Sequence, residues 1–183
     1  MYPGAKEELP KKMPKALGKE VEISTYVDAS FASDIKNRRS VTGIIIFLNN
    51  TPIKWYSKRQ NTIETSTFGA ELVAARIATE LIMETRYKLR MLGIPIKKNA
   101  TILFGDNKSV VMNMTLPSSS LKKRHNAIAY HFIRKAVAAG ILNFIHIPTT
   151  ENIADVLTKQ LPVNKFYDLL RPLLFNPISD SGE

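Results

Sequence analysis

The chain has 183 residues, enough for one domain with tails, and 44% of them are apolar, enough to bury a core. Lys and Arg total 26 against 16 Asp and Glu, and the resulting net charge of +10 favours a polyanionic partner. The absence of cysteine excludes disulfides, zinc fingers and thiol catalysis, and no apolar run reaches the roughly 18 residues of a membrane span.

The N-terminal third begins with a segment that does not look like part of a core. Residues 1–19 contain three prolines and five lysines without a hydrophobic period, which predicts a linker or a docking strap. Three segments rich in β-branched and aromatic residues follow, at 21–30, 41–50 and 51–60. The short spacing between them predicts three antiparallel strands in a meander.

Beyond residue 60 the pattern changes from strand to helix period. Apolar residues between Ala70 and Leu92 recur at helical spacing, which predicts one long amphipathic helix with Ser66 or Thr67 as N-cap and an end at Gly93. The remaining predicted elements are a strand at 100–107, a helix at 108–116, a helix at 128–137 capped by Gly140, a strand at 141–147 and short helices at 151–160 and 166–175. This order predicts an α/β fold in which helices pack on a mixed sheet.

The stretch from Asn107 to Thr150 contains no Asp or Glu. Its basic residues include Lys108, Lys122, Lys123, Arg124, Arg134 and Lys135. An acid-free basic tract that ends beside isolated acids is typical of a phosphate-facing surface next to a metal site. A solvated face is the alternative, although such a face usually mixes both signs of charge.

Four acids lie in apolar local sequence: Asp28, Glu71, Asp106 and Asp155. Removing a carboxylate from water is costly unless it is paired or binds a metal. Asp28 lies on the first predicted strand, Asp106 ends the fourth, and Asp155 follows the last, so all can meet at the carboxyl ends of parallel strands. Glu71 lies on the flank of the apolar stripe of the long helix, near the sheet.

Each of these acids has an ordinary explanation when it is taken alone. A strand-ending Asp is usually a turn residue, and an acid in the first turn of a helix usually faces solvent. The signal is the joint occurrence of four such acids in a basic chain without cysteine. Carboxylates are the ligands that Mg²⁺ prefers, and two ions about 4 Å apart can serve in-line attack on a phosphodiester.

Six ordered motifs then identify a family. YVDASFASD, RRSVTGIIIFLNNTPIKWYSKRQ, STFGAELVA, FGDNKSV, RHNAIAYHFIRKAV and NIADVLTKQLP together resemble the ribonuclease H domain of copia-type LTR retrotransposons, over about residues 20–175. The resemblance implies a ribonuclease H-like fold, an α/β fold with a five-stranded mixed sheet whose first three strands are antiparallel. It also implies that Asp28, Glu71, Asp106 and Asp155 are the catalytic and metal-binding tetrad.

The resemblance further implies a mechanism. Asp28 would bridge two Mg²⁺ ions, with Mn²⁺ as a possible substitute. Glu71 and Asp106 would hold the ion of the leaving group, and Asp155 would hold the ion of the attacking water. The expected activity is cleavage of the RNA strand of RNA/DNA hybrids during reverse transcription, leaving a 3′-hydroxyl and a 5′-phosphate.

The family also implies the context of the chain. Residues 1–19 would be a linker from a preceding polymerase region, 20–161 the ribonuclease H domain, and 162–183 a C-terminal extension and tail. The expected partners are the RNA/DNA hybrid and the reverse transcriptase region of the same polyprotein, with no membrane. The expected location is cytoplasmic, in virus-like particles.

Two positions depart from the pattern of cellular relatives, which usually carry a mobile His shortly before the last acid. The corresponding loop here, Pro-Thr-Thr-Glu-Asn, has no His, and His146 lies before it within a predicted strand. We therefore expect slower turnover or reliance on the rest of the polyprotein. Phe68 stands three residues before Glu71, where many relatives have a polar residue near the minor groove.

The expected substrate contacts are less specific than the acids. They are Asn107, Ser66, Thr67, Lys58, Arg59, Lys122, Lys123 and Arg124. Asn107 has a turn residue as its equal alternative, Ser66 and Thr67 are helix caps first, and the basic residues have a solvated face as theirs. Trp55 is expected in the core, with a nucleic-acid contact as the alternative.

Two other functions remain open at this point. The first is a catalytically silent module on the same fold that binds nucleic acid or docks within the polyprotein. The second is a different nuclease of the same fold, such as an integrase-like enzyme of DNA strand transfer. Likeness of fold alone cannot separate these possibilities.

Overall fold

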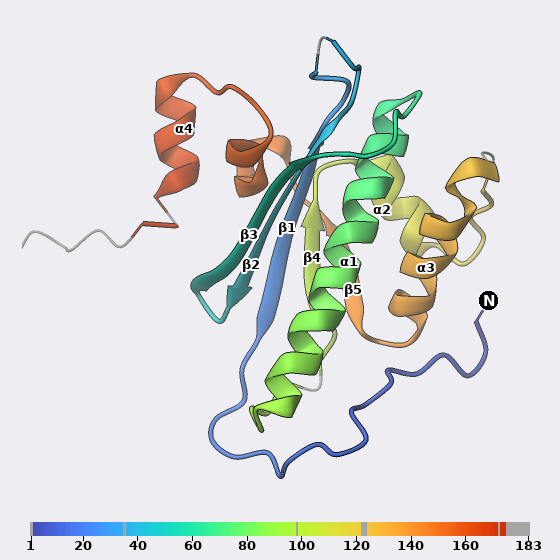
Figure 1. The fold of residues 1–183 in the computed structure, drawn as a ribbon, viewed down its shortest axis with the longest axis vertical. Coiled ribbons are helices and arrows are strands. Elements are labelled where there is room, and N and C mark those ends of the chain that lie inside the picture. Colours follow the sequence, from blue (N-terminus) through green and yellow to red (C-terminus); the bar gives the residue numbers. More distant parts are fainter. Residues whose placement is uncertain (1, 35, 98, 122–123, 172, 175–183) are drawn as a thin grey trace, which may run out of the picture.

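Five strands form one twisted sheet in the computed structural model, which describes residues 2–34, 36–97, 99–121, 124–171 and 173–174 (Figure 1). The strand order is β3-β2-β1-β4-β5. Strands β1 to β3 pair antiparallel, whereas β4 pairs parallel with both β1 and β5. The bounds are β1 Ile23–Ser30, β2 Val41–Leu48, β3 Thr51–Arg59, β4 Thr101–Gly105 and β5 Leu142–His146. The predicted mixed sheet with an antiparallel meander is therefore confirmed.

Helices cover both faces of this sheet. In Figure 1, helices α1, α2 and α3 lie on one face, and α4 lies on the other side with a neighbouring short helix. The bounds are α1 Thr67–Met91, α2 Lys108–Thr115, α3 Ala127–Ala138 and α4 Val163–Leu170, with 3-10 helices η1 Arg124–Asn126, η2 Thr149–Glu151 and η3 Ile153–Leu157. None of the helices in the described part of the chain is long and apolar enough to cross a membrane.

Strand β2 shows why the sheet needs a layer on each face. Its apolar run is continuous, so alternate side chains enter two different cores. Ile44 and Ile46 belong to the larger core, under α1 and α3. Ile45 and Phe47 belong to a smaller core with Ile153 of η3 and Leu169 of α4. The smaller core fixes η3, which carries Asp155, against the sheet.

The long helix α1 begins and ends as its sequence predicts. The Ser66 hydroxyl accepts a hydrogen bond from the Gly69 amide, 3.3 Å away, and so caps the N-terminus. Gly93 follows the helix with a φ of +71°, a conformation that side chains with a Cβ rarely adopt. The intervening apolar stripe packs against the sheet, and this places Glu71 at one end of the helix and Arg86 and Arg90 at the other.

The predicted helix at 151–160 is not observed. Instead, η2 and η3 follow one another, separated by Asn152 in extended backbone (φ −79°, ψ 97°). The Asn152 side chain is fully buried and donates a hydrogen bond to the Val27 carbonyl, 3.0 Å away. The extended backbone at Asn152 interrupts the helix, and the side-chain bond to Val27 holds this residue against β1, so the segment forms 3-10 turns instead of one regular helix.

Trp55 is not in the core, contrary to the prediction: it is 71% exposed. It pairs with Ile45 across the β2–β3 ladder and therefore lies on the face of the smaller core. However, β3 is the edge strand of the sheet, and the buried residues of the smaller core come from β2, η3 and α4. An aromatic on an edge strand can thus remain in solvent even though its neighbour across the ladder is buried.

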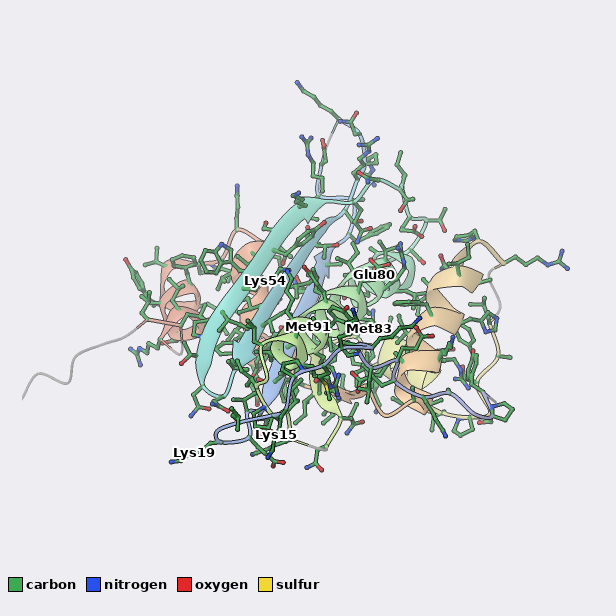
Figure 2. The ribbon with its side chains drawn as sticks, turned by 60° about the horizontal axis from the view of Figure 1, so that its bottom comes forward. Lys15, Lys19, Lys54, Glu80, Met83 and Met91 are labelled. Carbon is green, nitrogen blue, oxygen red and sulfur yellow. The ribbon has the colours of Figure 1, made fainter. Side chains whose placement is uncertain are left out.

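Residues 2–19, which we call the strap, run from α3, where the Tyr2 hydroxyl lies 2.6 Å from Nδ1 of His131, to the C-terminal half of α1. Figure 2 shows the strap passing next to Met83 and Met91, and the strap and these methionines line one cavity. The carboxylate of Glu7 is bound by the guanidinium groups of Arg86 and Arg90, with an Nε–Oε1 distance of 2.7 Å for Arg86. Packing of this kind fits the strap interpretation, while the origin of residues 1–19 as a linker stays a prediction.

Candidate metal centre

Three of the four predicted acids meet at the end of the sheet where the parallel strands β1, β4 and β5 terminate. Asp28 is near the end of β1, Asp106 directly follows β4, and Asp155 lies in η3, beyond the end of β5. Carboxylate oxygens of these three residues lie within 4.8 Å of one another. The parallel pairing of β1, β4 and β5 explains the meeting, because parallel strands end at the same edge.

The position of Asp155 depends on two residues that carry no charge. The Asn152 side chain caps η3 by accepting from the Ala154 amide at 3.2 Å while it donates to β1. Gly43 of β2 pairs with Asp28, and a Cβ there would lie 2.9 Å from the Ala154 carbonyl oxygen and 2.6 Å from Cγ2 of Thr158. The missing side chain therefore lets η3 approach the sheet closely enough to bring its acid to Asp28.

The same segment also supplies positive charge to the acids. The Lys159 ammonium lies 2.7 Å from Oδ1 of Asp155 and 3.1 Å from Oδ1 of Asp28. The Lys165 ammonium lies 3.2 Å from Oδ2 of Asp155, and the Thr158 hydroxyl donates to Oδ2 of Asp28. All four carboxylate oxygens of these two buried acids thus have a donor. This arrangement offsets much of the cost of burying them.

Glu71 lies beside this cluster rather than among the three converging acids. It is buried in the first turns of α1, accepts a hydrogen bond from the Ala29 amide and borders a cavity of about 630 Å³ together with Asp106 and Lys159. Burial raises its pKa well above the usual range, and the negative charges of Asp28 and Asp106 raise it further. The structure therefore brings all four predicted acids to the same end of the sheet.

Burial also raises the pKa of Asp28, and the charge of Asp155 adds to this effect, whereas Thr158 and Lys159 oppose it. Although burial disfavours the charge of Lys159, hydrogen bonds and charges of Asp155 and Asp28 raise its pKa. Carboxylates crowded in this way gain from a bound cation. The donor set consists only of oxygen atoms, with neither sulfur nor imidazole in the cluster, so it fits Mg²⁺ or Mn²⁺.

The predicted substrate residues are spread around the cavity and along β3. The Asn107 side chain borders the cavity and caps α2, accepting from the Val110 amide at 3.2 Å. Thr67 also borders the cavity, and Ser66 caps α1. Lys58 and Arg59 are exposed on β3, and Arg59 pairs with Asp34 at 2.8 Å. Arg124 is exposed in η1, and Lys122 and Lys123 lie outside the described residues.

The basic tract from Asn107 to Thr150 is not one continuous phosphate-facing surface. Arg134 is buried and donates to the backbone carbonyls of Asn113, Leu116 and Pro117, which follow or end α2. The Arg134 guanidinium therefore satisfies carbonyl groups at the C-terminus of α2. The prediction that Arg134 belongs to a phosphate-facing surface is wrong. Lys135 borders the cavity beside the strap, away from the acids. Lys108 remains at the site, on the rim of the acidic cavity.

The structure shows the surroundings of His146 and Phe68, the two residues involved in the departures from the family pattern. His146 ends β5, and its Nε2 lies 3.1 Å from the backbone carbonyl oxygen of Asp106, so an imidazole is close to the site although the following loop has none. Phe68 is partly buried and packs against the larger core. It therefore belongs to the packing of the first turn of α1.

Sequence reasoning missed Lys159, Lys165, Thr158, Asn152 and Gly43. Lys159 had a detectable signal, because it follows Asp155 by four residues, the spacing of a helical ion pair. Gly43 had none, since a glycine within an apolar strand does not show what approaches it. Asn152 acts through a contact with Val27, 125 positions away, and Lys165 reaches Asp155 from another element, 10 positions along the chain, so local patterns display neither contact.

Comparison with known proteins shows which sequences the chain resembles. No profile of a known protein family matches it. The chain is 35% identical over 150 residues to the retrovirus-related Pol polyprotein from transposon TNT 1-94 of Nicotiana tabacum, covering 81% of the chain and 11% of that protein. It is 30% identical over 156 residues to the Pol polyprotein from transposon RE2 of Arabidopsis thaliana, covering 85% of the chain and again 11% of the relative.

Solved structures resemble the chain in fold. LC11-RNase H1, isolated from compost, gives a TM-score of 0.56 at 21% identity, over 75% of this chain and 92% of that one. The N-terminal RNase H domain of a Mycobacterium tuberculosis protein gives 0.57 at 14% identity, over 76% and 91% of the two chains. The chain spans about a tenth of the length of its polyprotein relatives. The chain is thus homologous to one segment of the retrovirus-related Pol polyproteins of copia-type transposons, and it has the ribonuclease H fold.

Proposed function

We propose that the chain is a divalent-metal-dependent endoribonuclease that cleaves the RNA strand of RNA/DNA hybrids during reverse transcription of a retrotransposon. The observation that carries the proposal is the convergence of Asp28, Asp106 and Asp155 within 4.8 Å at the ends of parallel strands, with Glu71 beside them. The relatives are Pol polyproteins, and a solved structure of LC11-RNase H1, with a TM-score of 0.57, contains an RNA/DNA hybrid.

In this proposal Asp28, Glu71, Asp106 and Asp155 hold two Mg²⁺ ions, which Mn²⁺ can replace. The ions supply activation of water and stabilisation of the leaving oxygen during phosphodiester hydrolysis. The chain's own residues position the substrate. Lys108 and Asn107 border the acidic cavity, and the exposed Lys58 and Arg124 offer contacts to the phosphate backbone. Hybrid recognition then depends on groove shape and 2′-hydroxyls rather than on base sequence.

The proposal also covers the protein partner of the chain, its location and its two extensions. The reverse transcriptase region of the same polyprotein is the expected protein partner, and cytoplasmic virus-like particles are the expected location. Residues 20–161 carry all four acids, whereas residues 1–19 and 162–183 are extensions. Lys165, from the second extension, nevertheless contacts Asp155, so removal of that extension is expected to alter the site.

The test is cleavage of an end-labelled RNA/DNA hybrid by the purified chain, with Mg²⁺ and with EDTA. Single-stranded RNA and duplex DNA serve as parallel substrates. Cutting of RNA only in the hybrid, and only with metal, is the expected result. Cutting of duplex DNA would favour the integrase-like alternative instead.

The matched variant is Asp106→Asn, which keeps the shape of the side chain and removes its charge. Cleavage is expected to fall by at least about 1,000-fold, the scale expected when a metal loses a ligand that transition-state stabilisation needs. Circular dichroism and hybrid binding should be unchanged. Equal cleavage by the variant would remove Asp106 from the site. Hybrid binding without any cleavage, even after the polymerase is added back, would favour the silent module.

A further inference from the structure

The ammonium group of Lys159 lies where a cation between two acids of the cluster would lie. It bridges Oδ1 of Asp155 at 2.7 Å and Oδ1 of Asp28 at 3.1 Å. Both carboxylates are almost completely buried, with side chains 0% and 1% exposed, so few other positive groups can reach them. The two acids belong to the group whose oxygens converge within 4.8 Å.

An ammonium and a metal ion cannot share this position. Mg²⁺ binds carboxylate oxygens at about 2.0–2.1 Å, and a lysine nitrogen that holds the same oxygens at hydrogen-bond distance occupies the space between them. We propose that Lys159 is a built-in counterion of the acidic cluster, which a divalent cation displaces when it binds between Asp28 and Asp155. This inference rests on the proposed metal site and deepens it.

The surroundings of Lys159 allow such an exchange. Its side chain is 34% exposed and borders the open cavity together with Lys108, so the ammonium can move to solvent without unfolding of η3. The carboxylates cannot follow, because Asp28 is on a central strand and Asp155 is fixed through Asn152 and the smaller core. The mobile partner of the ion pair is therefore the lysine.

A second lysine distinguishes displacement from a general effect of charge. Lys165 contacts only Oδ2 of Asp155 among the described acids, at 3.2 Å, and does not bridge to Asp28. Lys108 borders the cavity, but none of the described acids forms an ion pair with it. Lys159 and Lys165 both lie within ion-pair distance of Asp155, so simple repulsion predicts similar effects when either charge is removed, whereas competition at the bridging position predicts a larger effect for Lys159.

The first experiment measures Mn²⁺ binding to the full chain by electron paramagnetic resonance, after removal of metals with EDTA and dialysis. Lys159→Met is expected to lower the Kd for Mn²⁺ by about tenfold, Lys165→Met by about threefold and Lys108→Met by less than about twofold. Lys159→Arg, which keeps the charge and can bridge two carboxylates, should not tighten binding. Equal affinities of wild type and Lys159→Met, or equal gains for Lys159→Met and Lys108→Met, would overturn the inference while leaving the metal site intact.

The second experiment needs no variant, in case Lys159→Met fails to fold without metal. Brief acetylation of the wild-type chain, followed by mass spectrometry, gives the reactivity of each lysine with and without saturating Mn²⁺. Lys159 should become severalfold more reactive with Mn²⁺, while Lys88, paired with Glu84 on the surface of α1, serves as the internal control. Unchanged reactivity at saturating Mn²⁺ would overturn the displacement. Failure of Mn²⁺ to bind any of the folded proteins would overturn both the metal site and this inference.

Discussion

At the C-terminal end of α1, Glu7 of the strap lies between Arg86 and Arg90, whereas at the N-terminal end Glu71 lies among other carboxylates. Burial disfavours the charge of Glu7, but the two guanidinium groups outweigh it and lower its pKa to about 2. At the other end, burial and neighbouring charges act together and raise the pKa of Glu71. At the C-terminal end of α1, the carboxylate of Glu7 thus stabilises the fold, whereas at the N-terminal end the carboxylate of Glu71 costs stability.

The opposite pKa shifts of Glu7 and Glu71 indicate that the two ends of α1 have different roles. A half-buried acid such as Glu7 that is paired with its own cations is complete within the chain, and its removal leaves the guanidinium groups unpaired. A buried acid among like charges is incomplete until a cation arrives, which is the usual condition of a catalytic or metal-binding group. In the proposed function, the N-terminal end of α1 therefore carries an acid that costs stability but serves the metal site, whereas the ion pairs at the C-terminal end stabilise the helix.

The largest effect on stability is expected from Glu7→Gln. Arg86 is only 3% exposed, and among the described residues its remaining side-chain hydrogen bond would be to the Thr101 hydroxyl, so its charge would be left without a carboxylate. We expect the free energy of unfolding at pH 7 to fall by about 3 kcal/mol. Urea denaturation followed by circular dichroism measures it. Glu8→Gln, in the same strap, is the control and should change it by less than about 0.5 kcal/mol.

The pH dependence of the same pair has a definite sign. The pKa of Glu7 is lower in the folded chain than its usual value of 4.5, so its stabilisation is present above pH 4.5 and is lost as the pH falls towards 2. The difference in stability between wild type and Glu7→Gln should therefore shrink over that window. A difference that stays constant from pH 7 to pH 2.5 would contradict the ion pair.

A smaller effect is expected from Gly43→Ala, at the other end of the sheet. The new Cβ would meet Thr158 and the Ala154 carbonyl, and η3 has to move away from β2. We expect a loss of about 1–3 kcal/mol, the range for overpacking, together with weaker Mn²⁺ binding because Asp155 moves with η3. Combining it with Thr158→Ser, which deletes the nearest methyl and keeps the hydroxyl, should restore part of both losses. No restoration would mean that the backbone contact dominates.

The smallest effect, and the only gain, is expected from Glu71→Gln. Because the folded-state pKa of Glu71 is raised, its charge destabilises the chain as the pH rises above about 4.5, and the amide removes that cost. In EDTA at pH 7 we therefore expect Glu71→Gln to have a higher free energy of unfolding than the wild type, as measured by urea denaturation. Glu80→Gln, exposed on the same helix, is the control. Loss of stability in Glu71→Gln would break the contrast between the two ends.

Sequence patterns predicted the elements well because their signals are local. Hydrophobic period identified α1, and carboxylates in apolar sequence identified four acids that the fold brings to one end of the sheet. Trp55 was misplaced because periodicity cannot show which strand becomes the edge. The helix expected at 151–160 was wrong because the Asn152 contact with Val27 joins residues 125 positions apart.

The same limit explains what was missed at the site and in the strap. Lys159 has a local signal towards Asp155, but its contact with Asp28 spans 131 positions, and only the fold shows that contact. Glu7 and Arg86 are 79 residues apart, so neither has a local pattern that indicates the other. Groups whose partners are distant in sequence were thus the ones that could not be predicted.

The parallel pairing of β1 with β4 also determines when the acidic cluster can form as the chain folds. Ser24 pairs with Ile102, and Asp155 joins only after β5 and η3 have docked, so the cluster depends on contacts between distant parts of the chain. Contacts of this kind are expected late in folding, since long loops have to close first. Divalent-ion binding during refolding would therefore report the arrival of the last segments, and partly folded chains would be unable to hold the ion.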